Sequence, residues 1–285
     1  MKAVEKSKNT GLANVQEVCG CWRLNRDAYY KLKTRMEHRK SDDSKVIELV
    51  KAERETQPRV GTIKLHKHLK VELDRMGVKM GRDRLFALLR HHDMLVGRKK
   101  ASFKTTNSYH HFHKYNNLIK DLKITRPNQV WVSDITYVRT VKGFCYLALI
   151  TDLFSRKIVG YDMSDSLELA GCLRALQKAL ANAKPAAGLV HHSDRGIQYC
   201  SKQYVAMLKK KNIRISMTEE NHCYENAVAE RVNGILKDEF YLDQCFTNLS
   251  HAKKAIKCAI HVYNNKRLHL SLGLKTPESV YKNVA

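Results

Sequence analysis

The sequence predicts an α+β protein, with a mixed sheet flanked by helices that is preceded by purely helical modules. Three β-branched and aromatic runs follow one another between residues 129 and 164, which favours neighbouring strands. Helix and strand patterns then alternate as far as residue 240, which favours a sheet covered by helices. In the first hundred residues, by contrast, apolar residues recur at helical spacing.

The charge of the chain indicates the class of its partner. The 285 residues hold 52 Lys and Arg against 28 Asp and Glu, which gives a net charge of +24. Residues 1–125 carry +15 of this excess and the remaining 160 residues carry +9. A surplus of this size suits a polyanion such as nucleic acid, and the N-terminal part is predicted to be the main region that grips it.

Residues 1–55 are predicted to form two or three helices. NVQEVCGCWRL and RDAYYKLKTRMEHRK flank a turn at Asn25, an arrangement typical of a helix-turn-helix unit with a basic second helix. Arg26, where the second of these runs begins, is a candidate DNA contact. A purely structural helical bundle remains the alternative for this region.

Residues 56–100 are predicted to form a second helix-turn-helix module. One helical run, TIKLHKHLKVELDRMG, ends at Gly77, and the next, GRDRLFALLRHHDM, starts after Gly81. Arg82 and Arg84 begin the second helix and are expected to reach DNA, with Lys64 of the first helix as a further candidate. Residues 101–126, which are basic and contain a histidine-rich stretch, are predicted to be a linker that follows the phosphate backbone.

The core is predicted over residues 127–265, with a C-terminal tail at 266–285. QVWVSDITYV is expected to be a strand, and the two apolar runs after it are expected to form an antiparallel pair that completes a meander. A helix before Pro185 and a short strand that ends at Asp194 follow, with Gly196 permitting a sharp exit of the chain. The expected order is strand, strand, strand, helix, strand, helix, strand, helix.

The last of these helices is predicted to have two different faces, because residues three, four and seven apart share a side. The polar face holds Asn226, Glu230, Asn233 and Lys237. The apolar face holds Ala229, Val232, Leu236 and Phe240. The apolar face is expected to pack against the sheet while the polar face presents Glu230 and Lys237.

Three carboxylates are the candidate catalytic and metal-binding residues: Asp134, Asp194 and Glu230. They lie 60 and 36 positions apart, the first two at strands and the third on the last helix. Mg²⁺ prefers oxygen ligands, so one or two carboxylates for each ion make a workable site. Two such ions stabilise both the attacking and the leaving oxygen when a phosphodiester is displaced. The pattern therefore indicates phosphoryl transfer.

The same residues carry a family resemblance. TRPNQVWVSDITYV, HSDRGIQY, the helix motif NAxxERxNGxLKxE and the tail YNNKRLHLSLGLKTP stand in this order. Together they resemble the DDE transposases encoded by bacterial insertion sequences (the OrfB class), whose catalytic core is similar to retroviral integrase and to ribonuclease H. The resemblance implies a ribonuclease H-like integrase core with a mixed five-stranded sheet. It also implies that Lys237 contacts transposon-end DNA. Asn226 and Asn233 are further candidates for support or DNA contact because they share a helix face with Glu230.

The resemblance implies a mechanism and a set of partners. Asp134 is expected to bridge two Mg²⁺ ions, with Asp194 holding one and Glu230 the other, and Mn²⁺ able to substitute. Such a protein would bind the terminal inverted repeats of a mobile element, cut DNA strands there and join them to target DNA. Because two DNA ends must be held together, a homo-oligomer is expected. Association or fusion with the product of a short upstream reading frame is a further expectation.

Other classes of protein are less favoured by the sequence. No apolar run approaches the roughly 18 residues of a membrane-spanning helix, and no signal-peptide core follows Met1, so a cytoplasmic protein without membrane contact is expected. The eight cysteines are scattered and form no CxxC, which favours free thiols over disulfides or a zinc site.

Two other functions stay open at this point. A decayed copy that acts only as a DNA-binding protein would have lost a carboxylate, whereas all three are present. A ribonuclease H-type nuclease would cleave without joining, and it would not need modules that recognise a DNA end. Taken singly, these residues also have non-functional explanations. An aspartate beside a strand often caps a turn, and a helical lysine such as Lys237 is often only solvated.

Overall fold

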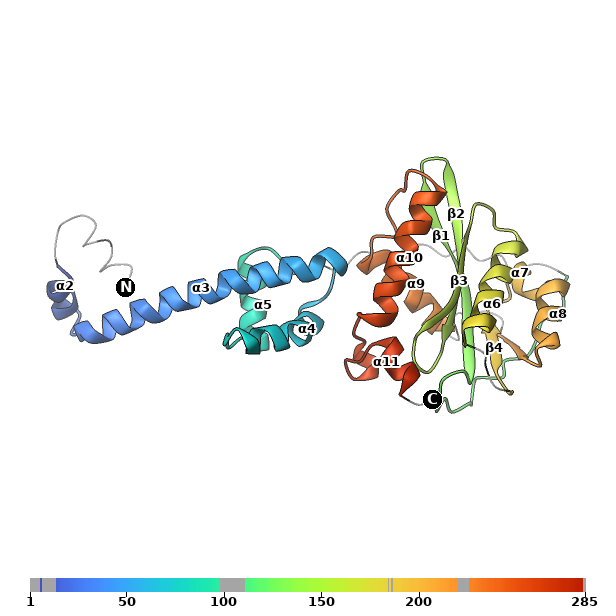
Figure 1. Cartoon of the computed structure of the whole chain (residues 1–285), viewed down its shortest axis with the longest axis horizontal. Helices are drawn as coiled ribbons and strands as arrows, with labels where there is room; N and C mark the ends of the chain where they lie inside the picture. The colour runs from blue at the N-terminus through green and yellow to red at the C-terminus, as the bar shows by residue number, and fades with distance from the viewer. Residues whose placement is uncertain are drawn as a thin grey trace. The chain divides into compact units, whose positions relative to one another are not determined.

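The computed structural model describes residues 6, 14–97, 111–183, 185, 187–219 and 226–283. They fall into two compact units, which are described separately. The helical unit lies within Met1–Glu55 and Gly61–Leu95, and the sheet unit lies within Thr56–Val60 and Val96–Ala285. Figure 1 shows both units, with most of their helices and strands labelled.

The helical unit contains four described helices, α2 (Val15–Cys21), α3 (Arg26–Thr56), α4 (Thr62–Arg75) and α5 (Arg82–His91). Asn14 begins α2 with a capping box, because its side chain accepts from the Glu17 amide while the Glu17 carboxylate accepts from the Asn14 amide. The expected boundaries are confirmed, because the chain turns at Asn25 before α3, Gly77 follows the end of α4 with φ 68°, and Gly81 is the N-cap of α5.

The long helix α3 differs from the expectation that it ends near residue 40. It continues through SDDS, where the Ser44 hydroxyl donates to the carbonyl of Lys40, to Thr56. Its second half is held by burial of Val46, Ile47 and Val50, which outweighs the weak helix propensity of the polar stretch. The two helix-turn-helix modules expected over residues 1–55 and 56–100 contribute to one compact unit. Within this unit, Asp43 of α3 pairs with Arg84 of α5 at 2.7 Å.

The sheet unit is built on five strands, β1 (Val130–Thr140), β2 (Gly143–Asp152), β3 (Ile158–Ser164), β4 (Val190–Ser193) and β5 (Arg214–Met217). Their order across the sheet is β3-β2-β1-β4-β5. The first three strands are antiparallel, whereas β4 runs parallel to β1 and β5 runs parallel to β4. The mixed five-stranded sheet and the meander that opens it are confirmed.

The helices of this unit are α6 (Leu169–Ala183), α7 (Ile197–Cys200), α8 (Lys202–Lys210), α9 (Ala227–Glu239), α10 (Leu249–Asn265) and α11 (Pro277–Lys282), with the 3₁₀ helix η2 (Leu270–Leu272). The expected order of strands and helices is confirmed, with the short α7 as an addition. Helices α6 and α8 flank the sheet on one side, and α9 and α10 flank it on the other (Figure 1). The flanked ribonuclease H-like core expected from the resemblance is thus observed.

Two apolar cores lie on the two faces of the sheet. One surrounds Trp131 and joins the sheet to α6, α7 and α8, and the other surrounds Leu147 and Leu149 and joins it to α9 and α10. Gly160 of β3 permits close packing of α6, since a Cβ there would lie 2.4 Å from the Ala175 carbonyl oxygen and 2.6 Å from the Ala179 Cβ. This close packing fixes α6 across the strands.

The segment before the core packs against it. Of the expected linker 101–126, residues 101–110 lie outside the described residues, while 111–126 are described. Four of its apolar side chains pack beside Val130, Val132 and Val190: Leu118, Ile119, Leu122 and Ile124. The amide of Leu118 also donates to the Ser216 hydroxyl at 2.8 Å. This part of the segment therefore extends the core.

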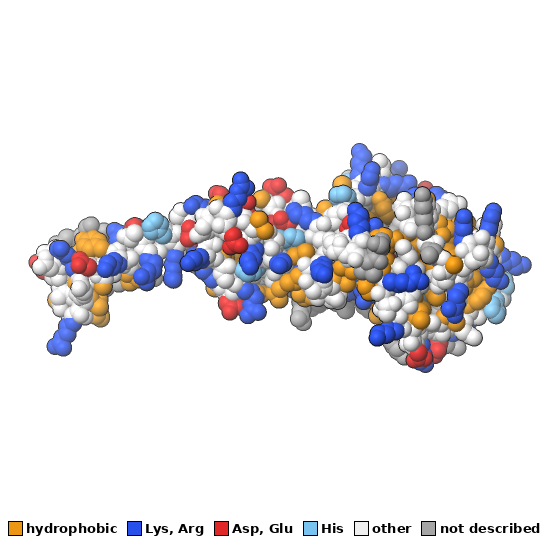
Figure 2. Space-filling model, turned by 60° about the horizontal axis from the view of Figure 1, so that its bottom comes forward, with side chains coloured by type: hydrophobic (Ala, Val, Ile, Leu, Met, Phe, Trp, Pro, Cys, Tyr) orange, Lys and Arg blue, Asp and Glu red, His pale blue; other side chains and the backbone are white. Residues whose placement is uncertain are grey.

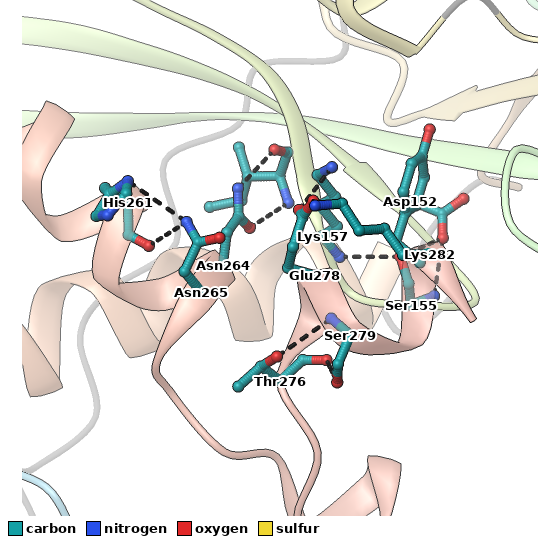
Figure 3. Close-up of polar contacts among 12 residues, drawn as sticks. Asp152, Ser155, Lys157, His261, Asn264, Asn265, Thr276, Glu278, Ser279 and Lys282 are labelled. Atoms are coloured by element: carbon teal, nitrogen blue, oxygen red, sulfur yellow. Dashed lines mark hydrogen bonds and ion pairs between the residues drawn. The ribbon is translucent and has the colours of Figure 1, made fainter. Parts of the chain in front are cut away.

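The C-terminal tail is also integrated into the sheet unit (Figure 3). Helix α11 is capped by Thr276, and its Glu278 forms ion pairs with Lys157 at 2.6 Å and with Lys282 at 3.1 Å. The amide of Asn264 on α10 both donates to the Ile158 carbonyl and accepts from the Ile158 N–H. Because β3 is an edge strand, this side chain occupies backbone groups that another strand would otherwise use.

Candidate active site

The register of the sheet brings two of the three predicted carboxylates together. Strand β4 pairs in parallel with β1 as far as Ser193 opposite Ser133. Asp134 and Asp194 each follow these residues by one position, so they lie side by side where β4 ends. Both side chains are half-buried. The aspartates that lie 60 residues apart in the sequence thus share one place in the fold.

Glu230 reaches the same region from the first turn of α9. The predicted apolar face of this helix is confirmed, because Ala229, Val232 and Leu236 are buried against the sheet. Glu230 itself is exposed. Its negative charge contributes to the rise in the pKa of Asp134, although less than the charge of Asp194 does. The glutamate is therefore the outermost of the three carboxylates.

The electrostatics of Asp134 are those of a carboxyl group in a crowded acidic site. Burial, followed by the charge of Asp194, raises the pKa of Asp134 from 3.8 to about 7. Two hydrogen bonds oppose this rise: the Ile135 amide donates to Oδ1 at 2.9 Å and the Asn233 side chain donates to Oδ2 at 2.7 Å. A carboxylate pair of this kind gains stability from a bound cation, which removes the mutual repulsion.

Asn226 is the N-cap of α9, and Asn233 lies seven residues, about two helical turns, further along. Both side chains face β1. Both are buried, and they hold neighbouring residues of the strand: Asn226 Nδ2 donates to the Ser133 carbonyl at 3.1 Å, and Asn233 Nδ2 donates to Asp134. Within the described part of the chain, the Oδ1 atoms of both amides are buried without a hydrogen-bond partner. Of the two roles expected for these amides, their contacts favour support of the carboxylates.

Lys237 lies two helical turns past Glu230 and is half-buried. Burial lowers its pKa, while the charges of Asp134 and Asp243 raise it. The influence of Asp134 shows that the ammonium group lies within electrostatic reach of the carboxylates. The structure thus brings Asp134, Asp194, Glu230, Asn226, Asn233 and Lys237 around the point where β4 ends beside β1.

The structure gives a different reason for a glycine at position 196 from the sharp exit that the sequence predicted. The backbone of Gly196 has φ −62° and ψ 143°, which any residue adopts, so a sharp exit is not the reason for a glycine. Its amide donates to Asp194 Oδ1 at 3.0 Å, and a Cβ at this position would lie 3.0 Å from the same oxygen. The missing side chain leaves room for the carboxylate of Asp194.

Sequence reasoning missed a buried polar cluster beneath the carboxylates. His191 Nε2 lies 2.7 Å from the Ser133 hydroxyl and 2.9 Å from the Tyr204 hydroxyl. Burial lowers the pKa of His191 to about 3, so the imidazole is neutral and serves as a hydrogen-bonding link. The cluster connects β1, β4 and α8 directly behind Asp134. Only the parallel register of β1 and β4, which the sequence does not state, would have revealed it.

Four DNA-contact candidates of the sequence analysis, Arg26, Lys64, Arg82 and Arg84, belong to the helical unit and not to the sheet unit that holds the carboxylates. Arg26 and Arg82 are exposed, and Lys64 is half-buried. Arg84 is tied within the unit, since its guanidinium donates to Asp43 at 2.7 Å and to the Lys79 carbonyl at 2.9 Å. Arg82 forms an ion pair with its neighbour Asp83 at 2.9 Å.

Other expectations can be compared with the described residues. Among them, no helix combines the length and the hydropathy that a membrane crossing requires. The described cysteines carry free thiols, with Cys19, Cys145, Cys172 and Cys200 buried. The described residues contain no cluster of three His, Cys, Asp or Glu arranged to hold a metal ion.

Comparison with known proteins identifies the family of the chain. Two family models described as integrase core domain match residues 124–223 and 211–277. An uncharacterized 31 kDa protein of the insertion element IS600 from Shigella sonnei is 37% identical over 91% of this chain and 96% of its own length. Transposase InsF of insertion sequence IS3A from Escherichia coli K12 is 32% identical over the full length of both chains.

A solved structure of the HTLV-2 integrase catalytic core in complex with magnesium covers 55% of this chain and 97% of its own, at 20% identity and a TM-score of 0.45. The identity and coverage of the insertion-sequence relatives decide the family. The chain belongs to the insertion-sequence transposases with an integrase core domain, which are DDE-type polynucleotidyl transferases that act on DNA.

Proposed function

We propose that this transposase binds the terminal inverted repeats of its own element and that Asp134, Asp194 and Glu230 carry out strand cleavage and strand transfer. The observation that carries the proposal is the pairing of Ser133 with Ser193, which sets the two aspartates side by side where β4 ends. Helix α9, bonded to the same strand through two asparagines, supplies Glu230 beside them. Carboxylates from three elements thereby converge on one place.

An integrase core of this family indicates dependence on a divalent metal. The residues present fit such a group: two adjoining carboxylates, one of which has a strongly raised pKa, and buried amide oxygens without a partner in the described residues. We propose that Asp134, Asp194 and Glu230 hold two Mg²⁺ ions, for which Mn²⁺ can substitute. When bound, the metal supplies electrostatic stabilisation of the charge that develops at the reacting phosphate.

The protein's own residues have separate tasks in this proposal. Asn233 orients the Asp134 carboxylate through its hydrogen bond, and Asn226 fixes the backbone immediately before it. Lys237 presents a positive charge to the phosphates of the DNA end. A water molecule first cuts a strand at the end of the element, and the freed 3′-hydroxyl then attacks a phosphodiester of the target. No covalent bond between protein and DNA is needed.

The basic surface supports a DNA partner for both units. Lys and Arg side chains are spread over the face that Figure 2 presents, and acidic side chains are fewer there. We propose Arg26, Lys64 and Arg82 of the helical unit as contacts to the element's ends. Arg84 would contact phosphate only by exchanging its ion pair with Asp43. Because two ends must be held together, we also propose a homo-oligomer on DNA, assisted by the product of a short upstream reading frame.

The test is cleavage and joining on a labelled duplex that carries the element's own end, with Mg²⁺ present. Wild type is expected to produce both cut and joined strands, and Asp194→Asn is expected to bind the duplex without producing either. Cut strands without joined strands from wild type would favour a ribonuclease H-type nuclease. Binding without chemistry, both with and without the upstream product, would favour a copy that acts only as a DNA-binding protein.

A further inference from the structure

The far end of the β1–β2 hairpin carries a group of aromatic side chains on one face of the sheet. Tyr137 pairs with Tyr146, and Arg139 pairs with Phe144, so all four side chains share one face. The ring centroids of Tyr137 and Tyr146 lie 5.2 Å apart, and those of Tyr137 and Phe144 lie 6.2 Å apart. The guanidinium of Arg139 lies 5.7 Å from the centre of the Phe144 ring. We refer to Tyr137, Phe144 and Tyr146 as the aromatic row.

The row is accessible, although its composition is that of a core. Phe144 exposes 52% of its surface, and both tyrosines are partly exposed. The adjoining side chains of the other sheet face, such as Cys145 and Leu147, are buried. Single exposed apolar residues are common on proteins, but three adjoining rings with a cation indicate a contact surface.

The charge of the hairpin indicates which partner it fits. Between Ile135 and Leu149 the chain carries Arg139 and Lys142 and no acidic residue. Aromatic rings combined with cations are the combination that binds nucleic acid strands, because the rings stack on bases while the cations attract phosphates. A purely apolar partner would gain nothing from the two charges.

The hairpin is held in place by hydrogen bonds on both sides of its turn. The Thr140 hydroxyl donates to the Gly143 carbonyl at 3.0 Å. The segment around Phe246 bridges the hairpin, since Val141 N–H donates to the Phe246 carbonyl and Phe246 N–H donates to the Arg139 carbonyl, each at 2.9 Å. The rings therefore stand on a fixed backbone, which reduces the entropy that binding would cost.

The row also lies close to the catalytic carboxylates along one strand. Tyr137 follows Asp134 by three residues, which is ~10 Å along the strand. Because this spacing is odd, the two side chains lie on opposite faces of the sheet, with Asp134 on the face that α9 covers. Strand β4 pairs with β1 only as far as Ser133, so the edge of β1 beyond it leads from the carboxylates to the row. A DNA strand held at the carboxylates would reach the rings by passing over this edge of β1 to the opposite face.

From these observations we propose that the aromatic row and Arg139 bind unpaired nucleotides of the DNA strand next to the cleavage position by stacking. A ring can stack only on a base whose face is open, and bases within a duplex are already stacked on each other. Frayed or cut ends offer such faces, and stacking tolerates any base. The proposal rests on the proposed function, because the cleavage position defines where the strand lies.

The test uses the full chain and the element-end duplex in two forms, blunt and with a short unpaired tail on either strand. Binding is measured by fluorescence anisotropy at one fixed salt concentration with a chelator, so that no cleavage occurs. Wild type should bind the tailed duplex more tightly than the blunt one. Phe144→Ala should weaken binding of the tailed duplex by at least about fivefold and leave the blunt duplex unchanged.

Three further variants separate stacking from other effects. Phe144→Trp should restore the preference for the tailed duplex because it restores a ring. Val141→Ala changes an apolar side chain that is 74% exposed on the same turn, and it should have no effect. Arg139→Gln should weaken binding of the tailed duplex and reduce its dependence on salt.

Several outcomes would overturn the proposal. Equal affinity of wild type for the two duplexes, or an equal loss on both in Phe144→Ala, would show that the row does not stack on unpaired bases. A changed oligomeric state in Phe144→Ala, with the tail preference intact, would show that the row is a contact between copies. If wild type binds neither duplex, the proposed recognition of the element's ends fails as well, which distinguishes that failure from loss of the stacking alone.

Discussion

Replacement of Asp134 by asparagine should make the sheet unit more stable at alkaline pH while it abolishes catalysis. Burial and the charge of Asp194 raise the pKa of Asp134 from 3.8 to about 7. The folded protein therefore keeps a proton on this carboxyl group up to about pH 7, whereas the unfolded chain releases it near pH 4. The stability that this one carboxyl group contributes is fully present below pH 4 and is lost as the pH rises from about 4 to about 7.

The magnitude follows from the size of this rise. At ~1.4 kcal/mol per pKa unit, a rise of about three units corresponds to ~4 kcal/mol, of which ~3 kcal/mol fall between pH 5 and pH 8. These values are upper limits, because Asp134 is partly exposed to solvent. The Asp134→Asn variant has no charge to lose, so its stability relative to wild type should rise by up to ~3 kcal/mol over this interval.

The assay is urea unfolding without metal at pH 5 and pH 8, followed by the fluorescence of Trp131. This side chain is fully buried in β1, whereas Trp22 of the helical unit is 66% exposed and can be replaced by Phe in both proteins. Added Mg²⁺ should recover part of the loss in wild type and not in the variant. Parallel stability profiles of the two proteins between pH 5 and pH 8 would refute the reasoning.

The remaining predictions concern the framework. Arg267→Ala should lower the free energy of unfolding by ~3–5 kcal/mol, because it leaves Glu239 without its buried bidentate partner; a loss below ~1 kcal/mol in urea unfolding would contradict this. Gly160→Ala should destabilise the sheet unit by ~1–3 kcal/mol, because the added Cβ clashes with α6. The control Gly234→Ala has open space around it in α9, so it should be neutral or stabilising by up to ~1 kcal/mol. Equal melting temperatures of the two variants would disprove the close-packing argument. Asn264→Ala should expose the backbone of Ile158 and increase aggregation in light scattering, while Asn265→Ala, whose side chain contacts only His261 of its own helix among the described hydrogen bonds, should not.

The sequence predicted the elements of the core because each has a strong local signal. Alternation and β-branching identify β1, and the spacing of three and then four residues between Ala229, Val232 and Leu236 identifies the buried face of α9. These patterns record which residues are buried in the core, so they predict the elements without knowledge of the tertiary contacts.

Partners across the sheet could not be predicted, because they depend on register. The amides of Asn226 and Asn233 lie on the expected polar face of α9, but the sequence does not show that this face turns toward β1 and that the amides bond to Ser133 and Asp134. The room that Gly196 leaves for Asp194 is likewise a tertiary contact. The length of α3 was misjudged because burial of Val46 and Val50 outweighs the local preference of SDDS.

The measurement that tests the central claim most directly is joining of a labelled element end to target DNA in Mg²⁺, with wild type, Glu230→Gln and Asp238→Asn compared at equal DNA binding. Asp238 is a carboxylate on the same helix that pairs with Arg59 instead of facing the aspartates, which makes it the matched control. Loss of joined product in Glu230→Gln alone, with binding retained, is the expected result. Joined product from Glu230→Gln at the wild-type rate would contradict the assignment of the catalytic site.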